Sequence, residues 1–87
     1  MELSSDQLEM LEKAGEALLN VDQCALIIEV DSFWLKSEFE NQKSEAYKRY
    51  YKGYFISLIK VRTSIIKLAA RGSFPAQQLL QKLVEKQ

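Results

Sequence analysis

Few residues in this chain have the side chains that catalysis usually requires. Histidine, the commonest general base and metal ligand, is absent. The single cysteine, Cys24, has apolar neighbours and fits a core position better than a nucleophile. Acidic pairs one helical turn apart, such as Glu9 and Glu12, could ligate a hard cation, although such pairs are more often part of a solvated helix face. The sequence therefore predicts no catalytic site, no metal site and no cofactor.

Aromatic and basic side chains are concentrated in one segment, YKRYYKGYF at residues 47–55. Such a segment can be a surface on which nucleic-acid bases stack, or a buried helix seam with its charges turned outward. Apolar residues at steps of four and three run through it, which is the spacing of a coiled-coil seam. The residues on this seam are Tyr47, Tyr51, Tyr54, Leu58, Val61, Ile65 and Leu68. Because most of the basic residues fall near the opposite face, we expect a packed seam and not a base-stacking surface.

Helix signals divide the chain into five segments, and no strand is predicted because period-two alternation is absent. The first two helices begin with capping-box patterns, Ser4 with Gln7 and Asn20 with Gln23. We expect helices over residues 5–19, 20–29, 32–40, 45–72 and 74–86. The fold class is therefore all-α: a small N-terminal bundle with a helix-turn-helix-like unit, then a long helix and a shorter antiparallel helix.

The core-facing residues of the first and fourth helices follow from this assignment. Leu8, Leu11, Leu18 and Leu19 are expected on the inner face of the first helix. Gly53 lies inside the long helix, where glycine costs about 1 kcal/mol relative to alanine. It indicates either the close approach of another backbone or a tolerated weakness in the helix.

Charge is distributed unevenly along the chain, although the formal net charge is zero. Residues 1–42 hold ten acidic residues and two lysines, whereas residues 43–87 hold ten basic residues and two glutamates. We therefore predict two domains, a helical bundle over 1–42 and an oligomerising helical hairpin over 43–87. The asymmetry favours an anionic partner for the basic half or contact between opposite halves of neighbouring subunits, and ordinary solvated helix faces remain the alternative.

The apolar stripe on the long helix is wide, and the last predicted helix is less than half as long. Since neither this helix nor the N-terminal bundle is expected to cover the whole stripe, we predict a homo-oligomer whose interface is the seam from Tyr47 to Leu68. No apolar run is long enough to span a bilayer, and the single cysteine suits a reducing compartment.

Residues 25–39, ALIIEVDSFWLKSEF, have the spacing of a helix-turn-helix. Ala25 takes the small-residue position, Asp31 caps the second helix, and Leu35 and Phe39 anchor that helix to the core. Glu29 stands where a glycine usually provides a left-handed residue, which leaves open a different turn. Other three-helix bundles can show the same spacing.

The second half of the chain carries further motifs: Y-x-x-G at 50–53, R-x-S-I at 62–65 and RGSFPAQ at 71–77. Together with the helix-turn-helix, they resemble the small terminase subunits of tailed bacteriophages and related prophage proteins over roughly residues 20–87. The resemblance implies a non-enzymatic DNA-recognition domain followed by a hairpin that assembles rings. It also implies a role in DNA packaging, a large terminase subunit as partner and a location in the cytoplasm of a bacterial host.

The presumed recognition helix, DSFWLKSEFE, departs from this pattern because it has more acidic than basic residues. Its outward residues are expected to be Phe33, Lys36, Ser37 and Glu40, of which Lys36 and Ser37 suit DNA. Phosphate contacts are better assigned to basic residues that follow it, namely Lys43, Lys48, Arg49 and Lys52. The alternative is an all-helical prophage adaptor or structural assembly protein that does not bind DNA, with its acidic surface against a basic face of the next subunit.

Overall fold

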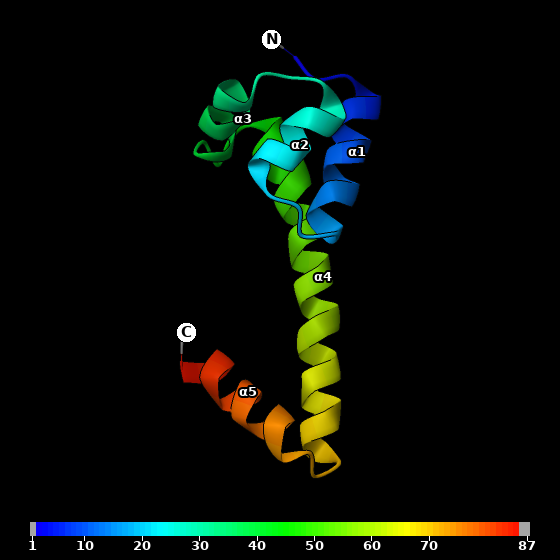
Figure 1. Ribbon diagram of the computed structural model, residues 1–87, viewed down its shortest axis with the longest axis vertical. Coiled ribbons are helices and arrows are strands. Elements are labelled where there is room, and N and C mark those ends of the chain that lie inside the picture. Colours follow the sequence, from blue (N-terminus) through cyan, green and yellow to red (C-terminus); the bar gives the residue numbers. More distant parts are fainter. Residues whose placement is uncertain (1, 86–87) are drawn as a thin grey trace. The chain divides into compact units, whose positions relative to one another are not determined.

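The computed structural model describes residues 2–85 and contains five helices in that range, with no strand among the described residues. The helices are α1 (Ser5–Glu16), α2 (Val21–Ile28), α3 (Ser32–Phe39), α4 (Glu45–Ala70) and α5 (Phe74–Glu85) (Figure 1). The predicted all-α class, with a small bundle followed by a long and a shorter helix, is confirmed. Within residues 2–85 no helix combines the length and apolarity required to cross a membrane.

Side-chain caps fix where the helices begin. Both predicted capping boxes are present: the Ser4 side chain accepts from the Gln7 amide and the Asn20 side chain from the Gln23 amide, and both glutamines reciprocate. The Asp31 carboxylate accepts from the Trp34 amide at the start of α3. These local hydrogen bonds explain why the helix starts could be predicted from sequence.

Two helices end on non-glycine residues in the left-handed conformation, Leu18 (φ 59°) and Glu29 (φ 58°). Leu19 N–H bonds to the Ala14 carbonyl and Leu18 N–H to the Gly15 carbonyl, which is a Schellman arrangement. Helix α1 therefore stops at Glu16, before the predicted end at residue 19. The prediction that Leu18 faces inward is wrong: it is 49% exposed because the left-handed residue takes the chain out of the helix.

The chain divides into two compact units, residues 1–57 (unit 1) and 58–87 (unit 2). Unit 1 has a core in which Leu11, Leu35 and Cys24 are fully buried. Ala46 and Tyr50, from the first part of α4, are buried in the same core. The boundary therefore lies further along the chain than the predicted boundary at residue 42, since α4 supplies one wall of unit 1.

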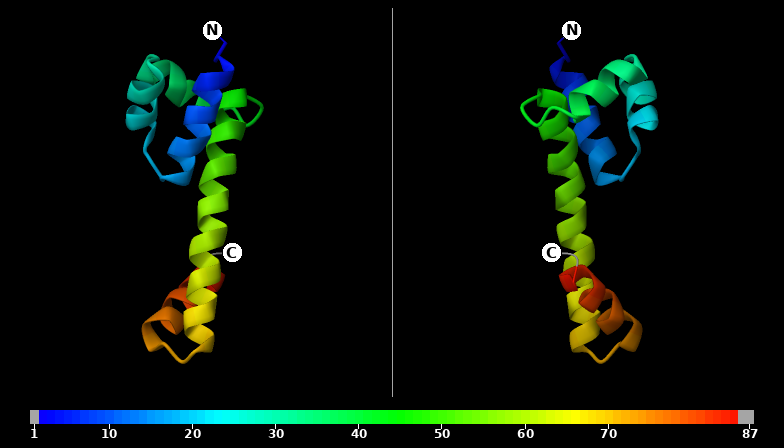
Figure 2. Two further views of the ribbon diagram at one scale, coloured as in Figure 1. Left: turned by 90° about the vertical axis from the view of Figure 1, so that its right-hand side faces the viewer. Right: turned by 90° about the vertical axis from the view of Figure 1, so that its left-hand side faces the viewer.

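Two glycines allow α1 and α4 to cross closely within unit 1, where the views show the two helices side by side (Figure 2). A Cβ atom on Gly53 would lie 2.0 Å from the Glu12 carbonyl oxygen, and one on Gly15 would lie 2.1 Å from the Tyr50 carbonyl oxygen. The close-approach interpretation of Gly53 is confirmed, and the approaching backbone belongs to the same chain.

Unit 2 consists of the last part of α4, a turn at Gly72 (φ 94°) and α5. The Ser73 side chain accepts from the Ala76 amide, and the Gln77 side-chain amide donates to the Ala69 carbonyl. The buried residues of unit 2 are two alanines, Ala69 and Ala76, among those described. This hairpin has local hydrogen bonds but almost no core of its own.

Candidate nucleic-acid interface

Helices α2 and α3 are joined by residues 29–31 and form a helix-turn-helix-like unit. Glu29 has φ 58° and ψ 51°, so the turn uses a left-handed residue at the position where glycine is usual. The Val30 amide donates to the Ala25 carbonyl and closes this turn. The turn thus keeps its usual form at this residue without glycine, at a cost of about 1 kcal/mol for a left-handed L-residue.

Helix α3 is anchored by its inner face and presents its outer face to solvent. Leu35 is fully buried, and the Phe39 ring packs 4.8 Å from the Tyr50 ring, centroid to centroid. The predicted outward residues are all exposed; they are Phe33, Lys36, Ser37 and Glu40. Phe33, near the start of the helix, is 77% exposed. A recognition helix reads base edges from this part of its surface.

Lys36 combines a charge pair with an aromatic contact. Its Nζ lies 3.6 Å from Asp22 Oδ1 on α2 and 5.6 Å from the centroid of the Phe33 ring. Both partners of the ion pair are largely exposed, so the pair contributes little to stability and can exchange for a phosphate contact. Lys36 therefore remains a candidate DNA contact.

Arg49 and Lys52 are paired with one acidic residue of α1. Glu12 Oε1 lies 3.1 Å from Arg49 Nε and 3.6 Å from Lys52 Nζ. The Glu12 and Arg49 side chains are mostly covered, so this contact joins α1 to α4. Of the predicted phosphate contacts, Arg49 is the least free to leave its position, whereas the exposed Lys52 can exchange its partner for a phosphate as Lys36 can.

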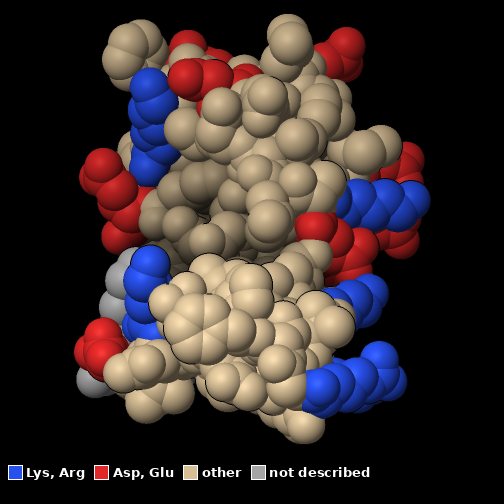
Figure 3. Space-filling model, turned by 60° about the horizontal axis from the view of Figure 1, so that its bottom comes forward, with Lys and Arg blue, Asp and Glu red and all other residues tan. Residues whose placement is uncertain are grey.

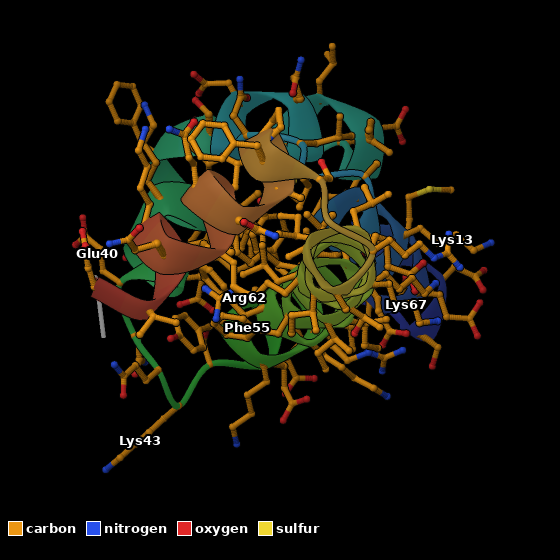
Figure 4. The ribbon with its side chains drawn as sticks, turned by 90° about the horizontal axis from the view of Figure 1, so that it is seen from below. Lys13, Glu40, Lys43, Phe55, Arg62 and Lys67 are labelled. Atoms are coloured by element: carbon orange, nitrogen blue, oxygen red, sulfur yellow. The ribbon has the colours of Figure 1, made fainter. Side chains whose placement is uncertain are left out.

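Lys43 and Lys48 form no ion pair within the described part of the chain and are exposed. Lys43 extends outward from the loop that joins α3 to α4, on a different side of unit 1 from Lys13 (Figure 4). Neither lysine has to break an ion pair of the described chain before it contacts a phosphate, so they are the strongest candidates among the predicted phosphate contacts.

The tyrosines of residues 47–55 contact one another, and Tyr50 and Tyr51 also line a shallow hollow together with Phe39 and Lys36. Tyr47 and Tyr51 ring centroids are 4.6 Å apart, and Tyr50 and Tyr51 are 5.0 Å apart. The Tyr50 hydroxyl donates to the Leu19 carbonyl, and burial, followed by neighbouring ionisable groups, raises the pKa of Tyr50 to about 12. The segment packs as a seam inside unit 1, which fits the prediction against base stacking.

Of the other candidates for chemistry, Cys24 belongs to the core and Glu9 is exposed. Cys24 is buried, and this burial raises the pKa of its thiol to about 11, so the thiol stays protonated at neutral pH. Among residues 2–85, no group of three or more His, Cys, Asp or Glu side chains is placed to hold a metal ion.

Sequence reasoning did not identify one hollow in unit 1. It has a volume of about 400 Å³ and an apolar lining with an acidic rim. The apolar lining is Leu3, Leu8, Trp34 and Ala46, and the acidic residues are Glu2, Glu38 and Glu45. Its residues come from the N-terminal segment, α1, α3 and α4, so no single motif in the sequence could have revealed it.

The predicted oligomer interface is covered to different extents along its length. Tyr51 and Tyr54 are partly buried against the core of unit 1, and Tyr47, Leu58 and Ile65 are partly buried. Val61 and Leu68 are 48% and 47% exposed. Figure 3 shows a broad uncharged surface toward the α4–α5 end, with charged side chains of both signs, mostly lysine and arginine, at its margins. The tyrosine part of the seam is thus occupied within one chain, and the exposed part lies in unit 2.

Searches of protein-family models, of curated proteins and of solved structures each found no match to this chain.

Proposed function

We propose that this protein is a non-enzymatic DNA-recognition module that acts as an oligomer, of the kind that selects DNA for packaging. One observation carries the proposal: α2 and α3 form a helix-turn-helix with a left-handed residue at Glu29 and an anchored, outward-facing second helix. In known helix-turn-helix proteins the second helix reads base edges in the major groove, and the exposed face of α3 offers Lys36 and Ser37 as hydrogen-bond donors for this role.

The outer face of α3 offers contacts of two kinds. Phe33 gives an apolar surface of the type that contacts a thymine methyl group, and Lys36 and Ser37 can donate to base edges or phosphates. Lys43 and Lys48 follow α3 and can contact the flanking phosphates. The acidic residues near them and the small number of unpaired lysines predict low affinity and a shallow dependence on salt.

The packaging role and the large terminase partner rest on the resemblance of residues 20–87 to small terminase subunits. A cytoplasmic location in a bacterial host follows from the same resemblance.

A second candidate is an all-helical adaptor or assembly protein that does not bind DNA. It is favoured by the pairing of three predicted DNA contacts with carboxylates of the same chain, Lys36 with Asp22, and Arg49 and Lys52 with Glu12. In this candidate the second helix of the unit contacts protein.

Fluorescence anisotropy on a labelled mixed-sequence duplex, at several salt concentrations, separates the two candidates. The wild-type chain is expected to bind at low salt. Lys43→Ala and Lys48→Ala are each expected to weaken binding and to reduce the slope of log K against log salt by about 1. The matched control is Lys13→Ala, an exposed lysine on another side of unit 1, which should leave the slope unchanged.

Two results would contradict DNA recognition. One is the absence of binding at the lowest salt by a chain whose circular dichroism shows a folded state, which favours the adaptor. The other is an equal loss of affinity in Lys13→Ala and Lys48→Ala. That result would mean that DNA responds to the net charge of the protein and does not bind at a defined surface.

A further inference from the structure

Unit 2 exposes most of its large apolar side chains. Its exposed large apolar residues are Ile59, Val61, Ile66, Leu68, Phe74, Leu79 and Val84. Against this, only Ala69 and Ala76 are buried within its described part. Contiguous exposed apolar surface rimmed by charge marks an interaction site.

The charge of the two units identifies which surface can cover it. Residues 1–57 contain eleven acidic and six basic residues, and residues 58–87 contain six basic and one acidic residue. Pairing two hairpins would bring two strongly basic units together, whereas pairing a hairpin with unit 1 of a second copy brings opposite charges together. Charge complementarity therefore favours a second copy in a head-to-tail arrangement.

One face of α4 in unit 2 has the composition that this contact requires. Ile59, Arg62 and Ile66 follow one another at steps of three and four, so they share one side of the helix. Ile59 is 65% exposed and Ile66 is 50% exposed, and Arg62 is also exposed. The face therefore presents two apolar side chains with a guanidinium between them.

The acidic-rimmed hollow of unit 1 complements this face. Leu3, Leu8 and Trp34 supply apolar surface for the isoleucines. Glu38 and Glu45 are carboxylates that a guanidinium can pair with. The apolar lining of the hollow can contact the isoleucines of the hairpin face, and its negative charge is opposite to that of Arg62. A nucleic acid is negatively charged and would be repelled by the same carboxylates.

We propose that the Ile59–Arg62–Ile66 face of one copy docks in the acidic-rimmed hollow of unit 1 in the next copy. The contact is heterologous, so each copy has one donor face and one acceptor site, and the assembly grows into a ring or a filament. The proposal deepens the oligomeric part of the proposed function and is independent of DNA binding, because it is tested without DNA.

The salt dependence of wild-type association gives a first test that needs no variant. Sedimentation velocity at tens of micromolar should show species larger than a monomer at low salt, and their fraction should fall as salt is raised. Association that strengthens with salt would indicate contact between like-charged hairpins and would overturn the proposal. A wild-type chain that stays monomeric would overturn it as well.

Complementary variants give the decisive test. Glu2→Lys with Glu38→Lys blocks the acceptor site, and Ile59→Ser with Ile66→Ser blocks the donor face. Each double variant alone should be monomeric, because growth needs both surfaces. An equimolar mixture should form a 1:1 dimer and nothing larger, since one working contact remains between the two variants.

Matched controls carry the same changes elsewhere. Glu9→Lys with Glu40→Lys reverses two charges of unit 1 outside the hollow, and Val61→Ser with Leu68→Ser removes apolar surface from another side of α4. Both should still form species larger than a monomer at low salt, where each blocked variant is monomeric, and thermal melts followed by circular dichroism verify that every variant folds. Loss of assembly only in Val61→Ser with Leu68→Ser would overturn the proposal in favour of the heptad seam, and so would a mixture of the blocked variants that stays monomeric.

Discussion

Unit 1 and unit 2 are built from similar proportions of apolar residues but bury them differently. Unit 1 closes a core in which Leu11, Leu35 and Cys24 are fully covered, and two of its helices cross at glycines. Unit 2 buries two alanines among its described residues and leaves its larger apolar side chains exposed. The difference shows that an amphipathic pattern predicts a buried face but does not say which surface buries it. Unit 1 supplies that surface itself, whereas for unit 2 the surface is the one that we propose a second copy supplies.

Truncating one large apolar residue in each unit should show this contrast most strongly. Leu11→Ala removes a fully buried side chain from unit 1 and should lower the free energy of unfolding by about 3 kcal/mol. Ile66→Ala should change it by less than about 0.5 kcal/mol in a dilute monomeric sample, because this side chain is half exposed. Urea denaturation followed by circular dichroism measures both. A similar loss in the two variants would mean that unit 2 has a core of its own.

The glycine crossing provides the next largest effect. Gly53→Ala should destabilise unit 1 by about 2 kcal/mol, because the added Cβ would meet the Glu12 carbonyl and force α1 away from α4. Alanine also favours the helix more than glycine does, which alone would raise the free energy of unfolding by about 1 kcal/mol. A net loss of stability in Gly53→Ala therefore indicates that the contact between α1 and α4 is tight.

Gly72→Ala is the comparison in unit 2, where no atom lies within 4 Å of the added Cβ and only the positive φ is strained. Its cost should be about 1 kcal/mol. A Gly53→Ala chain that is more stable than the wild type in thermal melts would refute the close crossing.

Unit 1 should lose stability in alkaline solution. The pKa of Cys24 rises from 9.0 to about 11 and that of Tyr50 from 10.0 to about 12 on folding, mainly through burial. Because both folded-state values are raised, the stability they contribute is fully present below pH 9 and is lost as pH rises through the folded values. Tyr50→Phe should lower the free energy of unfolding by about 1 kcal/mol at neutral pH, where it removes the bond to the Leu19 carbonyl.

Denaturant titrations from pH 8 to pH 12 measure this alkaline loss. In Tyr50→Phe the free energy of unfolding should fall less between about pH 10 and pH 12, because the titrating hydroxyl of Tyr50 is absent. A wild-type stability that is flat over this range would contradict the burial of the two groups.

The smallest expected effect concerns the turn of the helix-turn-helix. Glu29→Gly should stabilise unit 1 by about 0.5 kcal/mol, because glycine adopts the left-handed conformation without strain but loses more entropy on folding. Glu29→Ala is the control, since alanine keeps the strain and should give no gain. Thermal melts measure both changes, and a destabilised Glu29→Gly chain would show that the side chain of Glu29 contributes to the turn.

The sequence determined the elements that depend on near neighbours. Ser4, Asn20, Asp31 and Ser44 begin helices through hydrogen bonds to residues three positions away, so their spacing in the chain was sufficient to predict them. The outward face of α3 and the seam through the tyrosines followed from helical periodicity for the same reason. The left-handed Leu18 could not be predicted, because no single residue type signals it.

Only the tertiary structure decided what depends on distant residues. The pairing of Arg49 and Lys52 with Glu12 and the burial of Ala46 and Tyr50 in unit 1 join residues more than thirty positions apart or on different helices. The acidic-rimmed hollow likewise draws its lining from four parts of unit 1. Local pattern fixes which face of a helix is apolar, but the neighbour that covers the face is set by chain topology and packing, which no local pattern records.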